Sequence, residues 1–407
     1  MSKIPDATTL VARRSDSRSG KVFVPAQARR PVIGLEAEFT IYVDGEKRLP
    51  EEVFGNPQQI IRAPMIPRVG RSFHLPSGGA IYFDTGVVEV ATPIIELESG
   101  CCIRAVRSLW EQIRFLRAEL DHWEERTGSH IRLEGFSTHY NISVPETLGA
   151  NSASMRRLAL LLTYLLAAPI ALLAANRCST GVGVRPREKR LEVTVDFTPD
   201  PELMLAAVTF AIGVIAAVCA WPSFHLAELV DRGFPLIRGF TPRKHTSRKG
   251  FLARSDCFPQ NPFATDPNLP LWSLVDGRTV TLRQIAAESA KPFRDSLQTY
   301  ADPAVIRHIF AIFDGRARSL LDFAHRPGAY EDVGRIIDWE RREYRAVPRS
   351  KYEQVIHRIL THEPIRVGPH FYAAERMSGW YEVVFRNTVN GRRRVFNLDD
   401  LVRHCAI

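Results

Sequence analysis

The chain has 407 residues, of which 45% are hydrophobic and 24% are charged, and its formal net charge is +9. This length exceeds the size at which a single core usually stops growing, so we expect a large domain and a smaller one. The composition is typical of a globular protein and excludes fibrous and disordered classes. The positive charge suits a nucleic acid, a membrane surface or an anionic substrate. The absence of zinc-finger, RNA-binding aromatic and basic-zipper patterns disfavours nucleic acid.

The N-terminal segment and the cysteines indicate a compartment. Residues 1–30 are polar and rich in Arg and Ser, without an apolar core of the kind that leader peptides carry, and they predict a flexible arm. The six cysteines include no C-x-x-C pair, and the adjacent Cys101 and Cys102 suit neither a disulfide framework nor zinc. We therefore expect reduced cysteines and a cytoplasmic location.

The first half of the chain alternates strands with one clear helix. Period-2 alternation predicts strands, and apolar residues at helical spacing predict the helix. In chain order we expect a strand over 32–43 that ends in a turn at Asp44-Gly45, a long loop over 46–78, strand material over 79–95 broken at Thr85-Gly86, an amphipathic helix over 103–123, and strand structure over 131–144.

Two apolar segments follow, over 158–175 and 203–221, and each is long enough to span a bilayer. Pro169 interrupts the first, both are rich in Ala, and the loop between them carries charge. Buried core helices are therefore the prediction, with a transmembrane hairpin as the alternative. Between them we expect a Gly-rich loop over 179–184 and a strand over 190–197.

Beyond residue 221 the character of the chain changes. A basic, turn-rich stretch covers 231–268, shorter helices are predicted over 281–325 and 329–362, and Asn390-Gly391 between strands 380–385 and 392–396 is a strong hairpin signal. Strands and helices show no β-α-β rhythm, so the fold class is α+β with a mainly antiparallel sheet. We divide the chain into an arm (1–30), a catalytic core (31–230), a basic helical continuation (231–370) and a small C-terminal β-hairpin domain (371–407).

Carboxylates recur on the polar faces of the predicted strands. Glu36 and Glu38 are two residues apart, so they project from the same face, and such a pair is either solvated or bound to a cation. Three other strands also offer polar donors, namely Asp84 with Glu89, His139 with Asn141, and Glu192 with Thr194. Four such strands together predict a site for a hard cation with oxygen-rich ligation.

Arginines surround the loop that precedes the Glu192 strand. Arg177 lies before this loop, and Arg185 and Arg187 lie at its end. Arginine makes bidentate contacts with phosphate, and glycine lets a backbone approach it closely. The loop is therefore either a phosphate-binding element or a solvated basic loop.

Four ordered motifs over about residues 32–222 carry a resemblance to a known superfamily. The sequences N-R-C-S at 176–179, V-R-P at 184–186, K-R-L-E-V at 189–193 and T-P-D-P at 198–201 resemble the C-terminal half of the glutamine synthetase catalytic core. The sequences G-L-E-A-E-F at 34–39, and G-A-I-Y-F-D at 79–84 with E-V-A-T-P at 89–93, are similar to the carboxylate–amine ligase branch that contains the Pup ligase and the Pup deamidase.

The resemblance implies a curved antiparallel sheet backed by helices, which forms a cradle, and a small C-terminal α/β domain. It implies an ATP-dependent ligase that joins a carboxylate and an amine through an acyl phosphate, with Mg²⁺ or Mn²⁺ as the metal. It also implies roles for individual residues: Glu36, Glu38, Glu89, His139 and Glu192 as metal ligands; Arg177, Arg185, Arg187 and Asn141 at the nucleotide; Asp84 as the catalytic base and Arg185 as a second catalytic residue.

Two departures from the family pattern keep other functions open. Tyr140 stands where the family has a glutamate, and Thr194 stands where it has an arginine. An amide hydrolase or phosphotransferase on the same scaffold and a catalytically weak regulatory homologue are the alternatives. The substrates would be a carboxylate and an amine, with an acidic peptide or protein as a candidate that the basic stretch 232–254 would recruit. Neither nucleic acid nor membrane is expected as a partner, and the number of subunits stays open.

Overall fold

The computed structural model describes residues 30–68, 70–149, 152–245, 250–324, 333, 348–361 and 363–404. The chain divides into two units, residues 1–30 and 31–407. The predicted N-terminal arm lies outside the described residues except for Arg30, as does most of the helical stretch predicted over 329–362.

A twelve-stranded sheet forms the centre of the second unit, in the order β11-β12-β9-β10-β8-β1-β6-β5-β4-β3, with β2 and β7 also paired to β1. Every pairing in it is antiparallel. Its strands are β1 (Val32–Val43), β2 (Glu46–Arg48), β3 (Ile66–Pro67), β4 (Phe73–His74), β5 (Ala80–Asp84), β6 (Val87–Ala91), β7 (Ile95–Glu96), β8 (Ile131–Ser143), β9 (Val182–Pro186), β10 (Arg190–Asp196), β11 (Arg243–Lys244) and β12 (Phe251–Ala253). The predicted α+β class is confirmed.

Two hairpins of the sheet turn where the sequence predicts. Asp44 and Gly45 connect β1 to β2, and Thr85 and Gly86 connect β5 to β6; all four residues have positive φ. Two-residue turns with positive φ match the twist of the strands they join, and glycine adopts this conformation without strain. The second turn sets the register of β5 against β6, in which Tyr82 lies opposite Glu89.

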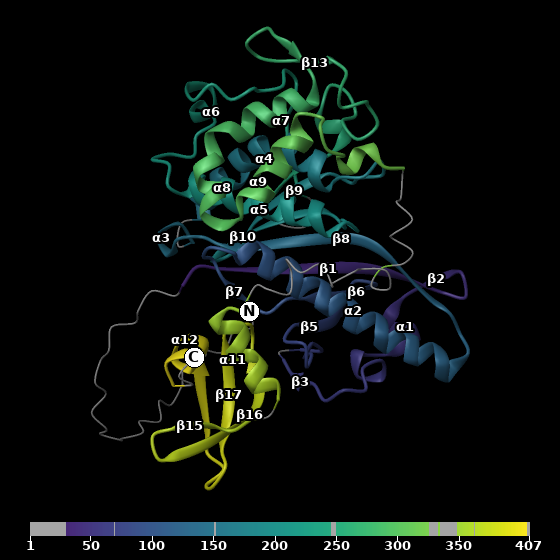
Figure 1. Ribbon diagram of the computed structural model, residues 1–407, viewed down its shortest axis with the longest axis vertical. Helices are drawn as coiled ribbons and strands as arrows, with labels where there is room; N and C mark the ends of the chain where they lie inside the picture. The colour runs from purple at the N-terminus through teal and green to yellow at the C-terminus, as the bar shows by residue number, and fades with distance from the viewer. Residues whose placement is uncertain are drawn as a thin grey trace, which may run out of the picture. The chain divides into compact units, whose positions relative to one another are not determined.

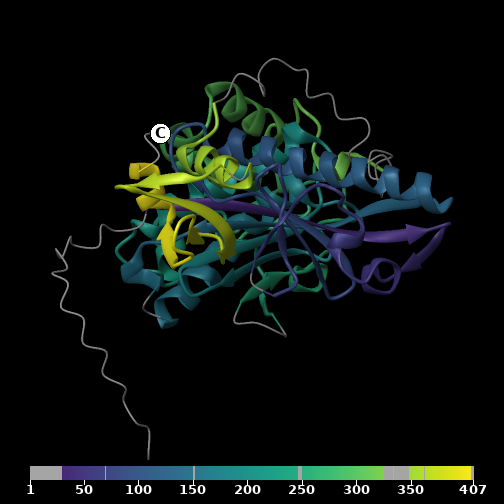
Figure 2. The same ribbon diagram turned by 90° about the horizontal axis from the view of Figure 1, so that it is seen from below.

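Helices cover the apolar face of the sheet. The helix α2 (Cys101–Thr127) runs along the strands and buries the predicted stripe that includes Leu109, Trp110 and Leu120 (Figures 1 and 2). The helices α4 (Ser152–Ala174) and α5 (Pro201–Cys219) pack together, and α7 (Leu282–Ala290), α8 (Arg294–Tyr300) and α9 (Pro303–Phe313) pack on them. Shorter helices are α3 (Glu146–Gly149), α6 (Ala227–Asp231) and the 3₁₀ turns η2 (Ser255–Cys257), η3 (Lys291–Phe293) and η4 (Leu320–Asp322).

The helices α4 and α5 are long and apolar enough to span a membrane, yet 83% and 78% of their most apolar windows are buried inside the protein. Their predicted burial as core helices is confirmed. Asp200 caps α5 by accepting hydrogen bonds from the backbone N–H groups of Glu202 and Leu203, and Pro201 occupies the first turn. This arrangement satisfies amides that a helix start leaves unpaired, so the T-P-D-P motif is a helix-start signal in this chain.

The segment 46–78 is not the long loop that we expected. It contains β2, α1 (Pro50–Phe54), η1 (Pro57–Gln59), β3 and β4. These elements are each two to five residues long, too short for a periodic signal. The strand β4 forms through pairing with β5, and β3 through pairing with β4, which a local pattern cannot reveal.

A second sheet and a second core lie in the C-terminal part. The sheet has the order β15 (Ile365–Val367), β16 (His370–Ser378), β17 (Glu382–Asn387) and β18 (Arg393–Asn397), and it contains the predicted hairpin as β17–β18. Its core also includes side chains of α11 (Lys351–Leu360) and α12 (Leu398–His404). This core contains Ile66 of β3, and its other members run from Tyr352 onward, ahead of the boundary that we placed at residue 371. A small two-stranded sheet, β13 (Trp272–Ser273) and β14 (Thr279–Val280), lies between the two regions in the sequence.

Candidate active site

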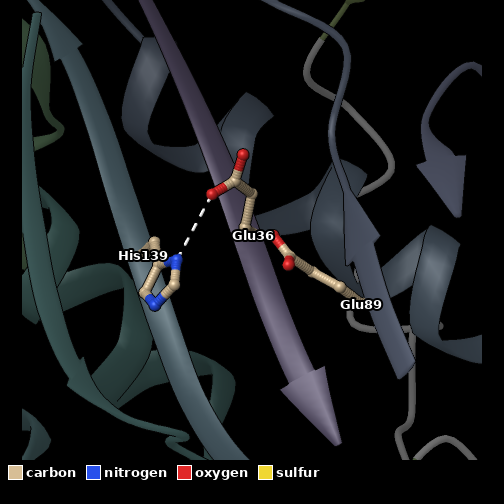
Figure 3. Close-up of side chains that lie close together, drawn as sticks. All are labelled: Glu36, Glu89 and His139. Atoms are coloured by element: carbon tan, nitrogen blue, oxygen red, sulfur yellow. Dashed lines mark hydrogen bonds and ion pairs between the residues drawn. The ribbon is translucent and has the colours of Figure 1, made fainter. Parts of the chain in front are cut away.

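The predicted metal ligands lie on neighbouring strands at the centre of the large sheet. The central strand β1 pairs with β8 on one side and β6 on the other, and this register places Glu36 opposite His139, and Glu38 opposite both Ser137 and Glu89. Figure 3 shows Glu36, Glu89 and His139 projecting from these three strands toward one another. Strand pairing thus brings together residues that are up to 103 positions apart in the sequence.

Distances within this group are short. The Nδ1 atom of His139 lies 3.3 Å from Oε2 of Glu36, and its Nε2 atom lies 3.6 Å from Oε1 of Glu38. One ligand atom each from Glu36, Glu89 and His139 lies within 4.8 Å of the others, and the same holds for Glu38, Asp84 and Glu89. We call these five residues the acid cluster.

The burial of the carboxylates decides whether they form a solvated strand face or a cation site. Glu38 is 8% exposed and Glu89 is 2% exposed, so the solvated strand face is excluded. Burial and then the charge of Glu36 raise the pKa of Glu89 to about 9, against a hydrogen bond from Tyr82. Burial also opposes ionisation of Glu36, but the hydrogen bond and charge of His139 outweigh it and lower the pKa of Glu36. Neighbouring buried carboxylates do not ionise together without a neutralising partner.

Two residues that the sequence analysis missed hold the carboxylates in place. The Tyr82 hydroxyl donates to Oε1 of Glu89, and the Ser137 hydroxyl donates to Oε2 of Glu38 at 2.5 Å. Counting back from the Thr85-Gly86 turn would have placed Tyr82 opposite Glu89. Ser137 was hidden by an irregularity in pairing, because the register of β8 shifts opposite Glu38 and Phe39. That shift lets the even-numbered residues before Phe136 and the odd-numbered residues from Ser137 share one face.

The predicted ligand Glu192 is not in the acid cluster. Both of its oxygens contact arginines: Oε1 accepts from Arg185, and Oε2 accepts from Nε of Arg187 at 2.7 Å. Its Oε1 atom lies 3.9 Å from Nδ1 of His139, so it borders the cluster. Two predicted phosphate-binding arginines are therefore neutralised by a predicted metal ligand. Strand register explains this pairing, since Glu192 lies opposite Arg185 between β10 and β9.

The remaining predicted residues lie around this centre in different ways. Asn141 forms a hydrogen bond with Glu36 and accepts one from Nε of Arg190 at 2.7 Å. Asp84 is exposed at the end of β5, where Thr85 donates to it. Arg177 instead donates to the carbonyl oxygens of Phe263 and Thr265, at 3.3 and 3.2 Å. No described contact joins Arg177 to the acid cluster.

Close packing of strands explains one glycine of the phosphate-loop motif. Gly183 on β9 lies opposite Thr194 on β10, and a Cβ at this position would collide with the Thr194 hydroxyl. Thr194 also lies opposite His139. The position where the family has an arginine thus carries a short side chain between a glycine and the cluster histidine.

A further arginine, Arg68, comes from the segment that we expected to be a loop. Its guanidinium lies 4.0 Å from the ring centre of Trp380, in the C-terminal part, and 5.5 Å from that of Tyr82. Its Nε atom donates to the Ser72 hydroxyl at 3.0 Å. Burial lowers the pKa of Arg68, and the nearby charges of Glu36 and Glu89 act in the opposite direction. The second sheet thereby holds a cation beside the acid cluster.

The acid cluster fits a hard divalent cation. It combines buried carboxylates with one imidazole, a donor set that suits Mg²⁺ or Mn²⁺. Glu89 is a carboxylate whose ionisation is disfavoured in the metal-free protein, and a bound cation would reverse that preference. The residues present therefore fit the metal that the sequence resemblance implies.

No known family model matches the chain, and no curated protein matches it. Among solved structures, it is similar to the Pup ligase PafA in complex with ADP, with a TM-score of 0.45, 12% identity and coverage of 97% of each chain. It is also similar to the crystal structure of PafA in complex with the prokaryotic ubiquitin-like protein Pup, with a TM-score of 0.52 and 14% identity, over 93% of this chain and 92% of that chain. The chain therefore has the α+β fold of a Pup ligase.

Proposed function

We propose that this chain is an ATP-dependent carboxylate–amine ligase that uses Mg²⁺ or Mn²⁺. The observation that carries the proposal is the convergence of the buried Glu89 with the half-buried Glu36 and His139 on one face of adjacent strands, with ligand atoms within 4.8 Å of one another. The Pup ligase fold, the bordering pair Arg185 and Arg187, and the exposed Asp84 support it. We place the protein in the cytoplasm.

The reaction would proceed in two balanced steps. An oxygen of the substrate carboxylate attacks the γ-phosphorus of ATP, the bond to ADP breaks, and an acyl phosphate forms. The amine nitrogen then attacks the acyl carbon, phosphate leaves, and the amine proton moves to Asp84. When bound, the cation would offset the charge repulsion between ATP and the carboxylate.

The residues of this chain would act mainly through charge and position. Arg185 and Arg187 lie beside the cluster and both contact the carboxylate of Glu192. When ATP binds, these two long side chains would leave Glu192 and contact phosphate oxygens. Asn141, fixed between Arg190 and Glu36, would contact the nucleotide. Arg177 would reach it after leaving the carbonyls of Phe263 and Thr265.

A peptide or protein is the substrate class that we favour. The face of the large sheet that bears the acid cluster continues as Thr40, Tyr42, Arg132 and Glu134, with Phe136 53% exposed beside them. Arg132 lies 4.0 Å from the Tyr42 ring centre and 3.1 Å from Glu134. Such a mixed row would suit an extended polypeptide better than a single small acid.

The second candidate function is amide hydrolysis on the same scaffold. The exposure of Asp84 favours it, because a base in contact with water can activate water as well as an amine. A hydrolase would cleave an amide with ATP retained, whereas a ligase forms one ADP for each amide bond made. The ratio of ADP to product therefore separates the two functions.

The experiment that tests the proposal measures ADP and amide products by mass spectrometry. The purified chain is supplied with ATP, Mg²⁺ and pools of carboxylates and amines, including acidic peptides. We expect ADP formation that requires both pools and disappears in Glu36→Gln. Glu125→Gln is the matched control, because Glu125 is a 73% exposed glutamate of α2 that belongs neither to the acid cluster nor to the mixed row on the sheet. ATP consumption by Glu36→Gln at the wild-type rate would overturn the assignment.

A further inference from the structure

The outer face of the C-terminal sheet carries a group of arginines that the proposed reaction does not use. The inner face is defined by the core residues Tyr372, Val383, Phe385 and Phe396. Side chains of a strand alternate between faces, so the residues between these point outward. The outward arginines are Arg366 on β15, Arg376 on β16, Arg386 on β17 and Arg393 on β18, and all four are exposed. We call these four residues the arginine face.

Strand register places three residues of the arginine face in two adjoining rows, and Arg366 lies in a further row, opposite Phe371. In one row Ala373, Arg386 and Arg393 lie opposite one another, and in the next row Arg376, Val384 and Val395 do so. Arginines directly opposite each other repel and destabilise a sheet.

Apolar side chains lie among these charges. Val395 is 53% exposed. Val384, which lies opposite it, is only 4% exposed. Phe371 is 48% exposed and lies opposite Arg366. The outer face is therefore a flat sheet surface that combines cations with apolar contacts.

The face already holds two carboxylates, Glu375 and Glu382, of which Glu382 lies two residues before the outward Val384. Glu375, at the irregularity in β16, accepts hydrogen bonds from Nε and Nη2 of Arg393 at 2.8 and 2.5 Å. That hydrogen bonding, followed by the charges of Arg393, Arg386 and Arg376, lowers the pKa of Glu375. The carboxylate of Glu375 thus lies among three guanidinium groups, which leaves an excess of positive charge and shows that carboxylate geometry suits the surface.

We propose that the outer face of the C-terminal sheet, built on Arg366, Arg376, Arg386 and Arg393, is a docking surface for an acidic surface of another protein. The fit is electrostatic, since exposed Asp and Glu side chains would pair with the arginines that Glu375 leaves unneutralised. The apolar residues Phe371 and Val395 would provide the dry contacts that such interfaces need.

Composition favours a protein over a nucleic acid as the partner. Residues 363–404 contain seven arginines and no lysine. Protein interfaces are enriched in arginine and depleted in lysine, whereas phosphate backbones accept both. A single exposed aromatic ring, Phe371, is also fewer than the successive stacking rings with which sheets bind single strands.

The test is an equilibrium binding measurement on the full chain, which needs no catalysis and therefore stands apart from the ligase proposal. The probe is a fluorescent peptide of about 15 residues with the repeat Glu-Glu-Leu. Its binding is measured by fluorescence anisotropy at low and at high salt. The triple variant R366E/R376E/R386E should weaken binding at least about 10-fold. The control K47E/R48E/R307E changes the same number of exposed charges elsewhere and should change the affinity less than about 2-fold.

A second variant makes the proposal falsifiable even if the triple variant does not fold. Glu375→Gln removes the carboxylate paired with Arg393 and frees that arginine, so it should strengthen peptide binding by about 3-fold or more. A purely structural role for the arginines predicts no gain. Unchanged affinity in both variants overturns the proposal. Tighter binding of an oligothymidine of equal charge, lost in the same triple variant, also overturns it, in favour of nucleic acid.

Discussion

The two sheets of this protein both place like charges side by side, with opposite consequences. Glu38 and Glu89 are opposed on β1 and β6, and they are 8% and 2% exposed. Arg386 and Arg393 are opposed on β17 and β18, where both are exposed. In the buried pair one carboxyl group is protonated, because burial and then the charge of Glu36 raise the pKa of Glu89 to about 9. The exposed pair stays charged, because solvent screens it.

This difference separates two ways of preparing a binding site. The repulsion between the carboxylates of the acid cluster can be relieved by a proton, by His139 or by a divalent cation. Hydrogen bonds such as that from Ser137 to Glu38 hold these carboxylates in place. The arginine face keeps its charge in water and can recruit a partner from a distance. Trp380, which follows β16, connects the two regions by contacting Arg68 beside the cluster.

The largest expected effect is on metal binding. Glu89→Gln removes one of the buried carboxylates while keeping an acceptor for the Tyr82 hydroxyl. We expect the affinity for Mn²⁺ to fall at least about 100-fold, measured by titration calorimetry. The metal-free variant should nevertheless be as stable as the wild type or more so, since Gln removes the cost of keeping Glu89 protonated in the folded protein at neutral pH.

The matched control for this variant is Glu134→Gln, on the same sheet face and outside the cluster. Its affinity for Mn²⁺ should equal that of the wild type. Equal loss of affinity in both variants would mean that net charge, and not ligation, attracts the metal.

The next effect concerns the junction of the two regions at low pH. His74 is fully buried, and burial, followed by the charge of Arg68, lowers its pKa from 6.5 to about 3. Between pH 6.5 and pH 3 the unfolded chain therefore binds a proton on His74 that the folded chain does not bind. The contribution of His74 to the unfolding free energy is fully present above pH 6.5 and is lost as the pH falls. At pH 5 the loss from His74 is about 2 kcal/mol.

Urea unfolding at pH 5 and pH 7.5 measures this loss. His74→Phe should reduce the difference in unfolding free energy between the two pH values by about 2 kcal/mol. His122→Phe, at an exposed histidine on α2, should leave that difference as it is in the wild type. Parallel pH profiles of the wild type and His74→Phe would contradict the assignment.

A smaller effect tests the contact between Arg68 and Trp380. Trp380→Leu loses the cation–π contact at 4.0 Å and the edge contact with the His74 ring. We expect a loss of about 1 to 2 kcal/mol in unfolding free energy. Phe371→Leu, an exposed aromatic of the same sheet, should cost less than about 0.5 kcal/mol. A double-mutant cycle with Arg68→Gln that shows no coupling would mean that the stack is incidental.

Sequence reasoning reached the fold class and many of its elements because their signals are local. The alternation in β1, the helical spacing in α2, and the turn residues Asp44-Gly45 and Thr85-Gly86 each lie within a short window. The ends of α4 and α5 lie within two residues of the predicted 175 and 221, whereas α4 begins at Ser152, six residues before the predicted start. These features follow from the backbone and its immediate side chains.

The site could be predicted as a set of polar strand faces but not as a set of contacts. Glu36, Glu89 and His139 meet because β1 pairs with β6 and β8, which is a long-range property. The pairing of Glu192 with Arg185 and Arg187 competes with the roles that the resemblance implies, and it depends on the register of β9 against β10. Arg68 and Trp380 had no detectable signal, because they are 312 positions apart and come from elements too short or too irregular for a period.

The smallest expected effect distinguishes a surface built for stability from one kept for binding. Arg386 faces Arg393 directly, while the nearby Glu375 is already paired with Arg393. The charges around Arg386 therefore sum to a net repulsion. Arg386→Gln should raise the unfolding free energy by about 0.2 to 0.5 kcal/mol in low salt, and the gain should vanish in 1 M salt, where the Debye length is about 3 Å. The measurement is urea unfolding at both salt concentrations, with Arg316→Gln as the control because Arg316 is paired with Asp314 and should lose stability if it changes at all. A loss of stability in Arg386→Gln would mean that Glu375 holds the arginines for the sheet itself. A gain would mean that the sheet bears a repulsion that only an anionic partner relieves, in contrast to the acid cluster, where a proton relieves it from within.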